Sequence, residues 1–62
     1  MTLIQEQTIE ALREEKWQLS ETMTLLCKAI TFQQGEYYCI FWPNGVMGLY
    51  LTKKDLVFPA SN

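Results

Sequence analysis

The chain has 62 residues, 48% of them hydrophobic, and its seven acidic and five basic side chains give a net charge of −2. The hydrophobic content argues against a disordered chain, and the length allows one domain at most. The acidic balance disfavours nucleic-acid binding, because proteins that bind nucleic acid usually carry a basic patch. No apolar run reaches the roughly 18 residues of a membrane span and no basic leader with an apolar core begins the chain, so we expect a small cytoplasmic protein.

The first predicted element is a helix over residues 2–28. Thr2 and Gln5 match a capping box, in which each side chain receives a backbone N–H of the other residue. Hydrophobic residues then recur at alternating steps of three and four, with Lys16 in the one missing slot. This heptad seam consists of Ile9, Leu12, Leu19, Met23, Leu26 and Ile30. The seam predicts either an amphipathic helix on its own sheet or a helix that also pairs with a second copy.

Residues 20–30 leave two readings open. We favour helix to about Lys28 with a kink near Ser20, which could cap a second helix after a break between Lys16 and Leu19. The alternative is a strand, because threonines favour sheet.

An antiparallel sheet is predicted from about 30 to 58. A short strand over 30–33 turns at Gln34-Gly35, and a hairpin follows with the three-residue loop Pro43-Asn44-Gly45. That loop places Trp42 opposite Val46 and continues the pairing to Tyr37 opposite Leu51. A helical turn is expected at 52–55, an edge strand at 56–58 and a frayed tail at 59–62.

The hairpin is apolar on both faces, although a hairpin with one wet face should alternate apolar and polar residues. One face, assigned to the core beneath the helix, carries Phe41, Cys39, Tyr37, Met47, Leu49 and Leu51. The other is rich in Trp and Tyr, which are common at the centres of interfaces. We therefore assign it to protein binding, through Tyr38, Ile40, Trp42, Val46 and Tyr50, with Gly48 leaving a dip.

Residues 35–56 resemble the second half of bacterial Src-homology-three-like domains. The resemblance rests on the aromatic stretch 35–40, on Asn44-Gly45 with the strand that follows to Leu51, and on Asp55-Leu56. Leu49 stands where that family usually has Trp, and Asp55 where it usually has Tyr. The resemblance implies a partial barrel and a binding module, not an enzyme.

Catalytic and metal chemistry find little support. The chain has no histidine, and two cysteines cannot complete a four-ligand zinc site. Cys27 and Cys39 sit in apolar runs, which favours buried free thiols over a disulfide or a nucleophile. Glu14, Glu15 and Asp55 fit a solvated surface, and the glycines form no phosphate loop. We expect no cofactor and no enzyme.

The predicted fold is α+β, with an N-terminal amphipathic helix on an antiparallel sheet of three or four strands. We expect a regulatory or inhibitory protein that acts by occupying a partner surface. We also expect a homo-oligomer, and a phage or mobile element as the source. One alternative is a structural accessory subunit. Another is a binder of single-stranded nucleic acid that stacks bases on Tyr38, Trp42 and Tyr50. Lys53-Lys54, the one adjacent basic pair, is assigned to an exposed turn.

Overall fold

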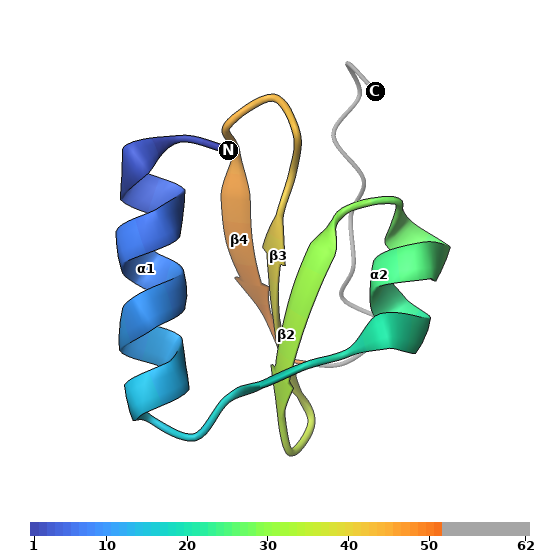
Figure 1. Ribbon diagram of the computed structural model, residues 1–62. Helices are drawn as coiled ribbons and strands as arrows, with labels where there is room; N and C mark the ends of the chain where they lie inside the picture. The colour runs from blue at the N-terminus through green and yellow to red at the C-terminus, as the bar shows by residue number, and fades with distance from the viewer. Residues whose placement is uncertain (52–62) are drawn as a thin grey trace.

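The computed structural model describes residues 1–51, which form two helices and four strands (Figure 1). The elements are α1 (Leu3–Glu14), β1 (Gln18–Leu19), α2 (Glu21–Cys27), β2 (Ile30–Gln34), β3 (Tyr37–Phe41) and β4 (Met47–Tyr50). The strands form one antiparallel sheet in the order β1-β2-β3-β4. The predicted α+β class, an N-terminal helix with a small antiparallel sheet, is therefore confirmed. The turn, edge strand and tail predicted for residues 52–62 lie outside the described residues.

Helix α1 begins with the predicted capping box. The Thr2 hydroxyl accepts the Gln5 backbone N–H at 3.1 Å, and the Gln5 side-chain carbonyl accepts the Thr2 N–H at 3.0 Å. Two backbone donors that helix geometry leaves without partners are thereby satisfied.

Helix α1 ends at Glu14, so the prediction of one helix over 2–28 is wrong. Lys16 adopts a left-handed conformation with φ of 72°, and two backbone hydrogen bonds connect the residues after the helix to its last turn. Trp17 N–H donates to Leu12 at 2.9 Å, and Lys16 N–H donates to Arg13 at 3.1 Å. This pair of bonds is a Schellman motif, which usually has glycine at the left-handed position. The chain then becomes extended and forms β1.

Helix α2 is a separate helix of seven residues. The Ser20 hydroxyl caps it by accepting the Met23 N–H at 3.2 Å, as one reading of the sequence foresaw. It ends at Cys27, and its C-cap residue Lys28 is left-handed with φ of 57°. Thr31 N–H donates to the Thr24 hydroxyl at 3.0 Å, which ties α2 to β2.

The two helices cover opposite faces of the sheet (Figure 1). On the α1 side, Ile9, Leu12 and Trp17 pack against a buried cluster of Phe32, Cys39 and Phe41. The Phe32 and Phe41 rings meet edge to face with centroids 6.1 Å apart, and the Arg13 guanidinium lies 5.7 Å from the Phe32 centroid. On the α2 side, the cluster consists of Met23, Cys27, Ala29, Tyr38, Ile40 and Trp42, with Tyr50 packed against it. The described chain is thus a three-layer arrangement with two small cores.

The β3–β4 hairpin has the predicted register. Tyr38 lies opposite Tyr50, and Phe41 lies opposite Met47. Trp42 N–H donates to Val46 at 2.8 Å and Gly45 N–H donates to Trp42 at 3.1 Å, which closes the three-residue loop. Gly45 has φ of 93°, the conformation that glycine adopts at no steric cost.

Candidate protein-binding surface

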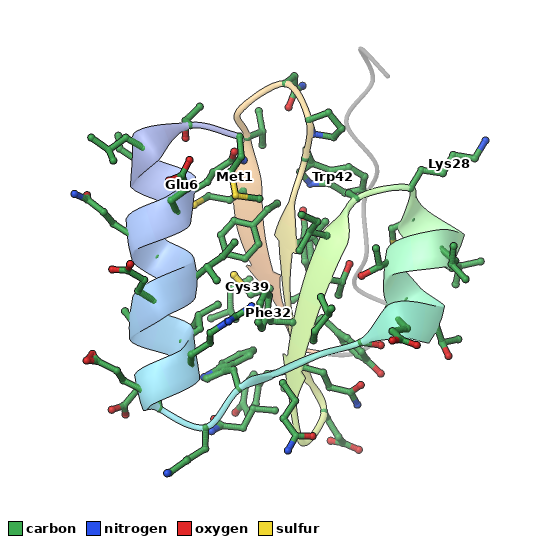
Figure 2. All side chains as sticks on the ribbon, viewed as in Figure 1. Met1, Glu6, Lys28, Phe32, Cys39 and Trp42 are labelled. Carbon is green, nitrogen blue, oxygen red and sulfur yellow. The ribbon has the colours of Figure 1, made fainter. Side chains whose placement is uncertain are left out.

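The aromatic face assigned to protein binding is a core face, and the expectation that it is uncovered is wrong. Helix α2 packs on it, so Tyr38 and Trp42 are buried and Ile40 is 0% exposed. Figure 2 shows Trp42 on the side of the sheet that faces α2, and Phe32 and Cys39 on the side that faces α1. Of the other two residues assigned to binding, Val46 is exposed and Tyr50 is partly buried.

The Tyr50 ring fills the dip that was expected at Gly48. A Cβ atom added to Gly48 would lie 2.8 Å from the Tyr50 hydroxyl oxygen, so the ring occupies the space above the glycine. Because Tyr38 and Trp42 are buried beneath α2, their rings do not form an open surface on which nucleic-acid bases could stack.

The heptad seam is not a continuous surface. Ile9 and Leu12 pack on the α1 side of the sheet, whereas Met23 is buried on the α2 side. Leu19 lies on β1 and Leu26 on α2, and both are exposed. The seam prediction is therefore wrong as a single helical stripe, because the left-handed turn at Lys16 sends α2 to the other face.

The face that was assigned to the core beneath the helix is covered in part. Helix α1 buries Phe41 and Cys39, since it packs over β2 and β3. The hydrophobic side chains on β4 and just beyond it remain exposed, with Met47 at 36% and Leu49 at 64%. We call this row the β4 strip: Met47, Leu49 and Leu51. Tyr37, on the same face of β3, is also exposed.

The backbone of β4 offers a second kind of contact. In an antiparallel pair, successive residues alternate between bonding to the neighbouring strand and pointing away from it. Because Trp42 bonds to Val46, the next bonded pairs are Ile40 with Gly48 and Tyr38 with Tyr50. The N–H and C=O groups of Met47 and Leu49 then point outward, and β4 is the end strand among the described strands.

The stretch of chain that contains this edge carries no charged side chain. Residues 37–51 contain no Asp, Glu, Lys or Arg, and Glu36 is the one charged residue over 29–51. Proteins usually protect edge strands with charged side chains, proline or bulges. The residues of β4, Met47–Tyr50, contain none of these protective side chains.

Gln5 fixes α1 relative to the hairpin loop, a contact that the sequence did not indicate. Its side chain is 1% exposed, and its Nε2 donates to the carbonyls of Trp42 at 3.1 Å and Val46 at 3.2 Å. One residue therefore caps α1 and binds both ends of the β3–β4 loop. The capping motif identified Gln5, but the partners 37 and 41 positions away come from tertiary packing.

The two cysteines are free and buried, as expected. Cys27 belongs to the α2-side core and Cys39 to the α1-side core, so the sheet separates them. Burial raises the pKa of both thiols above their usual range, and a hydrogen bond with Thr31 opposes that shift at Cys27. Thiols held in the neutral form are poor nucleophiles.

A surface hollow of about 440 Å³ lies at the end of the sheet where α1 begins and α2 ends. Its walls include Met1, Phe41, Trp42 and Pro43, and Lys28 is the one ionisable side chain among its described lining residues. These walls offer apolar contact but no acid–base pair. Within residues 1–51, no three or more potential metal-binding side chains (Cys, Asp or Glu) gather in one place, and neither helix has the length and hydropathy to cross a membrane.

Comparison of the chain with protein-family models, with curated proteins and with solved structures found no match. The resemblance to Src-homology-three-like domains therefore stays a prediction.

Proposed function

We propose that this chain is a non-catalytic protein-binding protein whose contact surface is the open edge of β4 together with the β4 strip. The observation that carries the proposal is the exposure of Met47, Leu49 and Leu51 along and just beyond β4, the uncharged end strand of the sheet that the structure describes. Contiguous exposed hydrophobic residues are a common mark of an interaction site.

The proposed binding mode is strand addition. An extended segment of a partner adds to β4 through main-chain hydrogen bonds, which supply affinity, while apolar side chains above the strand supply specificity. The outward N–H and C=O groups of Met47 and Leu49 provide the main-chain contacts, and Leu49, at 64% exposure, provides the largest uncovered side-chain contact in β4. A regulatory or inhibitory role then follows from occupying the partner's strand.

Site-specific photocrosslinking tests this function. A benzophenone side chain replaces Leu49 in one variant and Leu25 in a control, because Leu25 is 80% exposed on α2, away from β4. In an extract of the source organism, the variant at position 49 should form protein adducts that excess unlabelled chain suppresses. The control should form none of these adducts. If position 49 also yields no adduct that competes with unlabelled chain, the proposed function is wrong.

A further inference from the structure

We propose that the protein which occupies the β4 edge is a second copy of this chain, paired antiparallel to form a continuous sheet across the two copies. This inference rests on the proposed function, since it names the partner of the same surface.

The backbone of β4 is complementary to itself. A two-fold axis perpendicular to the sheet at Gly48 places Met47 opposite Leu49 of the second copy, and Leu49 opposite Met47. These are the residues whose N–H and C=O groups point outward, so each pair exchanges two hydrogen bonds. Such an interface is isologous, the type found in the most common class of oligomer.

The side chains of β4 fit the same arrangement. A two-fold axis perpendicular to a sheet keeps each copy's faces on the same side. The β4 strips of both copies therefore lie together on one face, and Met47 approaches Leu49 across the junction. Cross-strand apolar pairs of this kind stabilise antiparallel sheets.

Charge favours a second copy as the occupant. Two acidic copies, each with a net charge of −2, repel one another at most surfaces. Over residues 37–51 the chain has no charged side chain, so the paired β4 strands themselves bring no like charges together. The edge is thus a part of the molecule where self-association costs little electrostatically.

Sedimentation equilibrium between micromolar and millimolar protein tests the inference, together with amide hydrogen exchange of β4 at the same concentrations. We expect the mass to rise from monomer toward dimer. The Met47 and Leu49 amides should exchange more slowly as dimer forms. The Gly48 and Tyr50 amides, which bond to β3, should be protected throughout. Leu49→Lys should lower the association constant at least about tenfold, because a lysine blocks edge pairing, whereas Leu25→Lys should leave it unchanged.

A protein that stays monomeric at millimolar concentration overturns the inference, as does a dimer that Leu25→Lys disrupts and Leu49→Lys does not. Neither result affects the proposed function if position 49 still crosslinks to a different protein. Absence of every competed adduct at position 49 contradicts the function itself.

Discussion

At the scale of single residues, Gln5 both caps a helix and makes tertiary hydrogen bonds. Its side chain is buried; it accepts one backbone N–H at the start of α1 and donates two hydrogen bonds to the hairpin loop. The Trp42 carbonyl also accepts the Gly45 N–H, and the Val46 carbonyl also accepts the Trp42 N–H, so Gln5 is the second donor to each. The Gln5 amide therefore contributes two further hydrogen bonds, which hold the start of α1 against the hairpin loop.

Gln5→Glu separates that contribution from helix capping. Glutamate serves as well as glutamine in a capping box, so α1 itself should lose nothing. A carboxylate cannot donate to the Trp42 and Val46 carbonyls, and it would place a charge beside their oxygens at a position that is 1% exposed. We expect the free energy of unfolding in urea at pH 7 to fall by about 2–4 kcal/mol.

The variant should also recover stability in acid. Since the carbonyls disfavour the charged form, its folded-state pKa lies above the usual glutamate value of about 4.3, and stability returns as the pH falls through that folded value. The control is Gln34→Glu, because Gln34 is exposed and donates one bond, to the Glu15 carbonyl. Equal losses in the two variants would contradict the role of Gln5.

The buried thiols predict a stability change at alkaline pH. Burial raises the pKa of Cys39, so the folded protein keeps this proton to a higher pH than the unfolded chain. The stabilisation is complete below the pKa of an unfolded thiol, about 8.5, and is lost as the pH rises through the folded value. Urea unfolding at pH 8 and pH 10 should show a steeper loss for the wild type than for Cys39→Ala. Parallel losses would mean that Cys39 ionises equally in both states.

At the scale of elements, the sequence predicted what local rules determine. The capping box of α1, the loop at Pro43 and the register of β3 with β4 each depend on a few neighbouring residues, and each is confirmed. The end of α1 was misplaced because a lysine, not a glycine, adopts the left-handed conformation there. The sequence did contain one indication of this helix end, because Lys16 interrupts the heptad pattern at the position where the chain turns.

Lys16→Gly should stabilise the protein. Glycine adopts φ near 70° without the steric cost that a side chain adds, and we expect a gain of about 0.5–1 kcal/mol in the free energy of unfolding. The matched control is Glu10→Gly, on the exposed surface of α1, which should cost about 1 kcal/mol. Thermal or urea unfolding measures whether each variant raises or lowers the free energy of unfolding. Destabilisation by Lys16→Gly would contradict the Schellman motif at the end of α1.

At the scale of the whole molecule, two short helices cover both faces of one small sheet. The binding face was misassigned because the Trp and Tyr residues that suit an interface also suit a core beneath a helix. Helix α2 has seven residues, too few for its pattern to show that it packs there. On the α1 side of the sheet, the β4 strip stays uncovered because α1 packs over β2 and β3 and does not reach β4.

The placement of α1 and α2 on opposite faces is the claim on which the rest depends, and the contacts between core methyl groups and aromatic rings test it most directly. In a nuclear Overhauser spectrum of the protein at low concentration, the Met23 methyl should show cross-peaks to the rings of Tyr38 or Trp42. Ile9 and Leu12 methyls should show cross-peaks to Phe32 or Phe41. Cross-peaks that join Met23 to the α1-side rings, with none to Tyr38 or Trp42, would place both helices on one face and contradict this account.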